Sequence, residues 1–133
     1  MMKSIKITIE RSEDSFWAYA TNEPLIVGGG HTIDACKQDV LDCIDTLKEL
    51  NAKNKPNFLK GDYTLVYQID TQSFLEHYGK VFSRAALSRL TGINEKQLGH
   101  YIQGVHKPRK DKAEKIEKAL HGLGRELLSL ELV

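Results

Sequence analysis

The side chains best suited to recognition chemistry lie in one short stretch, TGINEKQLGHYIQG, at residues 91–104. In a helix over 94–103 the apolar residues gather on one side, and they are Leu98, Tyr101 and Ile102. Polar residues take the other side, and they are Glu95, Lys96, Gln97 and His100. Lysine and glutamine suit guanine and adenine edges, and glutamate can accept a hydrogen bond from cytosine. A helix side with these residue types favours recognition of duplex DNA.

A second helix must hold this one in place. Residues 83–90 form a short amphipathic run, Gly92 follows it, and Asn94 is a good N-cap for the next helix. Glycine adopts the backbone of a tight turn without steric cost. Two short helices joined by such a turn predict a helix-turn-helix, whose second helix reaches base edges in the major groove. An ordinary pair of helices with a solvated polar side is the alternative.

Residues on either side of the second helix are expected to contact phosphates. Arg84 begins the first helix, and a basic loop follows the second. Phosphate contacts would position the duplex, and the helix would select the sequence. The predicted DNA-binding residues are Arg84, Asn94, Glu95, Lys96, Gln97, His100, Gln103, Lys107, Arg109 and Lys110.

The segment SRAALSRLTGINEKQLGHYIQGVHKPRKDKAEKIEKAL resembles the lambda-repressor/Cro-like family, also called XRE-type. The resemblance lies in the LSRLTGI turn, in Leu98, in the YIQG end of the second helix and in the basic loop with Pro108. An apolar helix follows, with Ala113, Ile116, Ala119 and Leu120. The resemblance implies an all-α domain that binds a double-stranded DNA operator and represses transcription.

The first half of the chain predicts a small sheet with one helix. Alternating and β-branched residues predict strands over 4–11, 16–21, 25–27 and 63–69. The triplet Gly28-Gly29-Gly30 reads as a flexible turn after the third strand, and an amphipathic helix follows over 32–51. The order is therefore β-β-β-α-β. Because the helix joins the third and fourth strands, we expect those two strands to pair in parallel.

Pattern and charge both change near residue 70. From Asp70 onward only helices are predicted, over 71–79, 83–90, 94–103, 111–121 and 123–131. This part holds 11 Lys and Arg against 8 Asp and Glu, a net +3, whereas the earlier part holds 8 against 10, a net −2. We therefore expect two domains, 1–69 and 70–133, with different partners.

The first domain combines this element order with the polar hairpin turn RSEDSF and the helix start GGGHTIDAC. In these features it resembles the HicB-like antitoxin family. The resemblance implies a partial ribonuclease H-like fold, a small HicA-like ribonuclease toxin as the partner, and repression of the operon by the antitoxin. A stand-alone helix-turn-helix regulator, whose first domain dimerises or senses a ligand, is the alternative function. In either case two copies are needed to read two half-sites, so we expect a homodimer or a higher homo-oligomer.

Two groups of residues are candidates for binding the protein partner. Trp17 and Tyr19 lie on a short hairpin, where they belong either to internal packing or to a partner surface. The helix over 32–51 carries acidic residues that form either a solvated face or a docking surface for a basic toxin. These residues are Asp39, Asp42, Asp45 and Glu49.

No residue pattern predicts catalysis, a metal or a cofactor. Glu10 and Asp14 are too few carboxylates for two-metal nuclease chemistry. No Ser, Cys or acid is placed to assist His31, and no phosphate-binding motif accompanies the glycine triplet. The chain has no apolar run of membrane-spanning length and starts without an apolar signal core, so we expect a cytoplasmic protein that is not an enzyme.

Overall fold

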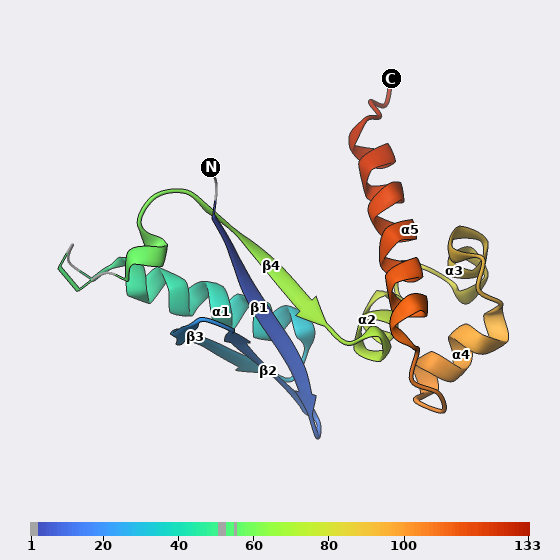
Figure 1. The fold of residues 1–133 in the computed structure, drawn as a ribbon, viewed down its shortest axis with the longest axis horizontal. Coiled ribbons are helices and arrows are strands. Elements are labelled where there is room, and N and C mark those ends of the chain that lie inside the picture. The colour runs from blue at the N-terminus through green and yellow to red at the C-terminus, as the bar shows by residue number, and fades with distance from the viewer. Residues whose placement is uncertain (1–2, 51–52, 55) are drawn as a thin grey trace. The chain divides into compact units, whose positions relative to one another are not determined.

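The computed structural model describes residues 3–50, 53–54 and 56–133. The predicted α+β class is confirmed, since the described chain holds a four-stranded mixed sheet and five α-helices (Figure 1). The chain divides into two compact units, the first ending at Asp70 and the second beginning at Thr71.

The sheet of the first unit has the order β3-β2-β1-β4. Its strands are β1 (Lys3–Ser12), β2 (Ser15–Ala20), β3 (Glu23–Gly30) and β4 (Tyr63–Ile69). Strands β1 to β3 pair antiparallel, and β4 pairs in parallel with β1. The expected pairing of the third and fourth strands is therefore wrong, because β3 and β4 form opposite edges of the sheet. The helix between them carries the chain to the free edge of β1.

The glycine triplet belongs to β3 and is not a flexible turn. Gly28, Gly29 and Gly30 pair with residues of β2. A Cβ at Gly28 would lie 2.7 Å from Val40 Cγ2, and one at Gly30 would lie 2.8 Å from Ala35 Cβ. The missing side chains therefore let the following helix approach the strand closely. The register is irregular between Tyr19 and Ala20, so Pro24 is tolerated beside the break in the ladder.

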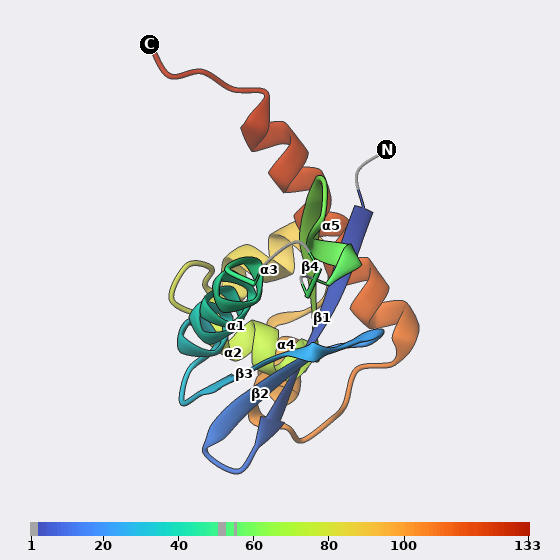
Figure 2. The same cartoon turned by 90° about the vertical axis from the view of Figure 1, so that its left-hand side faces the viewer.

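Helix α1 (Ile33–Lys48) covers one face of this sheet (Figure 2). Thr32 caps it, because its Oγ1 accepts a hydrogen bond from the N–H of Ala35 at 3.0 Å. The core between helix and sheet contains Ile5, Ile7, Ile9, Ala18, Ala20, Ile26, Ile33, Cys36, Val40, Ile44 and Leu59. A short 3-10 turn, η1 (Asn57–Leu59), precedes β4.

The second unit contains helices only. They are α2 (Thr71–Tyr78), α3 (Arg84–Thr91), α4 (Glu95–Gln103) and α5 (Lys110–Leu128). The expected break between helices over 111–121 and 123–131 is wrong, because α5 runs through Gly122 and Gly124. Each interior glycine weakens a helix by only about 0.5–1 kcal/mol, which does not end it. The core of this unit contains Leu75, Leu87, Ile93, Leu98, Tyr101 and Ile116.

Candidate functional site

Helices α3 and α4 are joined by a connection of three residues whose ends are capped by hydrogen bonds. Gly92 ends α3 with φ of 78°, and its N–H donates to the carbonyl oxygen of Ser88 at 2.8 Å. Asn94 begins α4, since its Oδ1 accepts from the N–H of Gln97 at 2.8 Å. The positive φ explains the glycine, because other side chains adopt it at a steric cost.

The buried hydroxyl of Thr91, for which no role is predicted above, stabilises this connection. Thr91 Oγ1 donates to the carbonyl oxygen of Leu87 at 2.7 Å and accepts from the N–H of Ile93 at 3.2 Å. Leu87 and Ile93 are both buried on either side of it. A threonine immediately before the turn glycine was the available signal. The relative position of α3 and α4 is thus set by packing and by paired main-chain groups.

Fewer polar side chains are exposed on α4 than the sequence predicts. Glu95, Lys96 and Gln103 are exposed, whereas Gln97 and His100 are half-buried. The Nδ1 atom of His100 is buried and has no hydrogen-bond partner among the described residues. Its ring meets that of His106 edge to face, with centroids 5.0 Å apart. His100 is therefore partly committed to holding the loop after α4.

The remaining predicted DNA-binding residues lie around α4. Lys107, Arg109 and Lys110 are exposed in the loop between α4 and α5 and at the start of α5. Lys110 Nζ lies 4.0 Å from a Glu114 carboxylate oxygen, but this pair is solvent-exposed and contributes little. Asn94 is exposed, although its side-chain oxygen is occupied by the cap described above.

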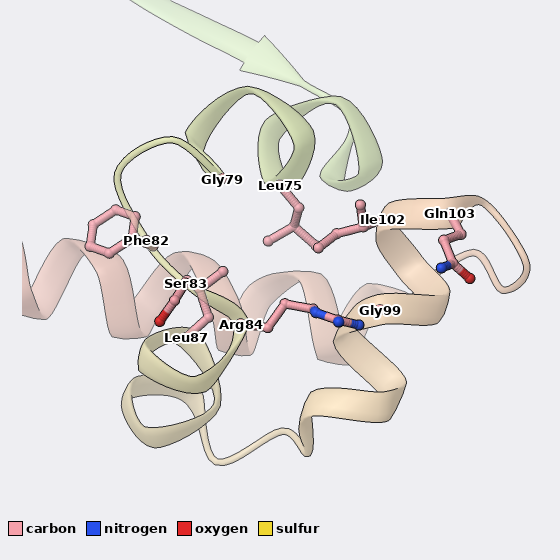
Figure 3. A pocket seen from close by; sticks show the side chains of 9 residues that line it. All are labelled: Leu75, Gly79, Phe82, Ser83, Arg84, Leu87, Gly99, Ile102 and Gln103. Atoms are coloured by element: carbon pink, nitrogen blue, oxygen red, sulfur yellow. The ribbon is translucent and has the colours of Figure 1, made fainter.

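Arg84 lies across a shallow surface hollow between α2, α3 and α4 (Figure 3). The hollow has an apolar lining from Leu75, Phe82, Leu87 and Ile102 and polar groups from Ser83, Arg84 and Gln103. Figure 3 shows the Arg84 side chain extending from α3 to the position of Gly99 on α4. Arg84 is an exposed residue, and it forms no ion pair with a carboxylate of the described residues.

The first unit exposes apolar side chains on the sheet face that α1 does not cover. The exposed fraction is 58% for Trp17, 41% for Tyr19 and 54% for Val27. We call this surface the open sheet face; it comprises Trp17, Tyr19, Leu25, Val27 and Val66. The Tyr19 hydroxyl donates to Glu10 Oε1 at 2.9 Å, and this hydrogen bond raises the pKa of Tyr19. Exposed apolar residues gathered on one face are typical of a docking surface.

The acidic candidates lie on the opposite side of the first unit, on α1. Asp39 accepts a hydrogen bond from the main-chain N–H of Gly29 at 2.9 Å, so it closes the outer edge of β3. Asp42 accepts from Gln38 Nε2 at 3.0 Å. Asp45 and Glu49 are exposed. The two groups of candidate partner residues therefore do not form one continuous surface.

The expectation that no serine is placed beside His31 is wrong. The Nδ1 atom of His31 lies 3.3 Å from Ser15 Oγ, which ties the start of β2 to the turn before α1. His31 is exposed, and no acidic side chain of the described residues is hydrogen-bonded to its ring. No group of three or more metal-ligating His, Cys, Asp or Glu side chains is found in the described part of the chain.

Comparison with models of known protein families, with curated proteins and with solved structures finds no match to this chain. None of the helices in the described ranges is both long enough and apolar enough to cross a membrane.

Proposed function

We propose that this chain is an antitoxin of the HicA/HicB type. It represses its own operon by binding a DNA operator through α3 and α4, and it neutralises a small basic ribonuclease toxin through its first unit. The proposal rests above all on one observation: α4 exposes a polar side and follows α3 after a three-residue connection that is capped by Gly92 at one end and Asn94 at the other.

DNA recognition follows from which groups α4 exposes. Lys96 lies in the first turn of α4, the end that reaches base edges when such a helix enters the major groove. Lys107, Arg109 and Lys110 follow α4 closely enough to contact the phosphates that flank it. The +3 charge from Asp70 onward favours approach to DNA, and binding should weaken as salt concentration rises.

A second copy is required because a single α4 contacts too few base pairs for selectivity. Helix α5 offers a surface for it. Leucines continue the line of the buried Ile116 at alternating steps of four and three residues, which is the spacing of paired helices. These residues are Leu120, Leu123 and Leu127. Leu127 is 57% exposed, so the end of this line, which we call the α5 stripe, lacks a cover.

The first unit supports the antitoxin assignment through its element order and its open sheet face. Three antiparallel strands, a helix and a parallel fourth strand agree with the partial ribonuclease H-like module that the resemblance implies. The open sheet face carries apolar residues without a cover, which suits protein binding better than small-molecule binding. This favours the antitoxin over a stand-alone regulator that senses a ligand.

The test is co-expression of the chain with the products of its neighbouring reading frames. An antitoxin should co-purify with a small basic neighbour and restore growth to cells that express that neighbour alone. A chain that binds promoter DNA but neither co-purifies with a neighbour nor rescues growth would be a stand-alone regulator instead.

A further inference from the structure

Gly99 occupies the middle of the exposed side of α4. Successive helical residues are rotated by about 100°. Gly99 therefore lies on the same side of α4 as Glu95 and Lys96 of the preceding turn and Gln103 of the following turn. All three of these residues are exposed, yet Gly99 is buried. A residue without a side chain in the centre of an exposed face is therefore covered by something else.

The cover is the side chain of Arg84 from α3. A Cβ at Gly99 would collide with Nη1 of Arg84 and would lie 3.6 Å from its Cζ and 3.9 Å from its Cδ. The guanidinium thus rests where the side chain of residue 99 would begin (Figure 3). Glycine is the poorest helix former after proline, so a glycine inside α4 destabilises this helix. The absence of a side chain at Gly99 leaves the space that the Arg84 guanidinium occupies, which explains the glycine.

We propose that Arg84 reads a base edge and that Gly99 positions it for this purpose. The inference rests on the proposed DNA binding and changes the expected role of Arg84 from phosphate contact to base recognition. Because its guanidinium lies on the exposed side of α4, it enters the groove together with Lys96 and Gln103. An unpaired guanidinium presents a planar pair of donors, which matches O6 and N7 of guanine.

The experiment is a selection from a library of duplexes with a randomised central segment, performed with the full chain and with Arg84→Ala. The wild-type protein should enrich a sequence with guanine at one position of each half-site. Arg84→Ala should lose the preference at that position alone and bind the wild-type sequence about 5- to 150-fold more weakly. A phosphate contact would instead leave every preference intact and reduce the salt slope by about one. That outcome would overturn the inference.

Gly99→Ala tests the positioning role without removing the arginine. The new methyl group displaces only the flexible end of Arg84, so the fold should survive with an unchanged or higher melting temperature. We expect the same loss of guanine preference as in Arg84→Ala, and no further loss in the double variant. Gly124→Ala is the matched control, since it also fills a helical glycine but has nothing within 4 Å of the new Cβ. Retained guanine preference in Gly99→Ala would show that Gly99 does not position Arg84.

DNA binding by the chain and base recognition by Arg84 are tested separately by these experiments. If the wild-type chain enriches no sequence and does not shift duplex DNA at low salt, the proposed function and this inference both fall. If the wild type enriches a sequence whose guanine preference persists in Arg84→Ala, only the inference falls.

Discussion

The carboxylate of Asp39 on α1 and the main-chain N–H of Gly29 on β3 are joined by a hydrogen bond of 2.9 Å. The contact pairs the Gly29 N–H, which lies on an edge strand whose unpaired main-chain groups could otherwise bind a strand of another chain. Asp39 therefore has a structural role, although in the sequence it looks like a surface charge.

Removing this contact should weaken the edge of the sheet. We expect Asp39→Ala to lower the free energy of unfolding by about 1–2 kcal/mol, because the N–H of Gly29 loses a charged acceptor. Amide exchange at Gly29 and urea unfolding followed by circular dichroism measure the effect. Asp45→Ala, an exposed residue on the same helix, should change neither quantity. Equal effects of the two changes would show that the hydrogen bond does not stabilise the edge.

The close approach of α1 to β3 predicts a steep cost for a methyl group at Gly28. The new Cβ would lie 2.7 Å from Val40 Cγ2 and 2.9 Å from the Val40 nitrogen, and neither atom can move freely. Gly28→Ala should therefore lower the free energy of unfolding by about 1–3 kcal/mol. A melting curve indistinguishable from wild type would mean that α1 can shift away from the sheet without cost.

Local patterns predicted most of the elements but not their long-range pairing. The alternation of Ile5, Ile7 and Ile9 predicted a half-buried strand, and the spacing of Cys36 and Val40 predicted the buried side of α1. Both depend on neighbours in the sequence. The parallel pairing of β4 with β1 does not, because it is decided by which sheet edge remains free after α1 has packed.

Glycines account for several further differences between sequence and structure. In isolation the run from Gly28 to Gly30 looks like a turn, and only the helix packed against it explains why side chains are absent. Gly122 and Gly124 look like a helix end, but α5 continues through them. The Arg84 contact with Gly99 joins two helices, so no local spacing could reveal it.

If the open sheet face is the docking surface for the protein partner, Trp17 should be central to it. We expect Trp17→Ala to weaken the complex with the co-purifying toxin by about 2 kcal/mol or more, since buried tryptophans dominate such interfaces. DNA binding should be unchanged. Titration calorimetry on the purified pair measures the change. The comparison variant Glu49→Lys reverses a charge on α1. If Glu49→Lys weakens the complex more than Trp17→Ala does, the docking surface is α1 and not the open sheet face.

The α5 stripe predicts where two copies meet. Leu127→Glu places a charge within the stripe and should shift the dimer to monomers in sedimentation velocity at matched concentration. Leu128→Glu is the control, because its side chain leaves α5 about 100° away and is already 89% exposed. A dimer that survives Leu127→Glu would place the contact between copies elsewhere.

The most direct measurement of the central claim is binding of the full chain to duplex DNA from its own promoter region, with unrelated duplex in excess. Wild type should form a complex that the unrelated duplex does not displace, and Lys96→Ala should lose that selectivity while its fold and its protein complex persist. A promoter duplex that stays unbound at low ionic strength, or a complex equally selective in Lys96→Ala, would contradict recognition of DNA by α4.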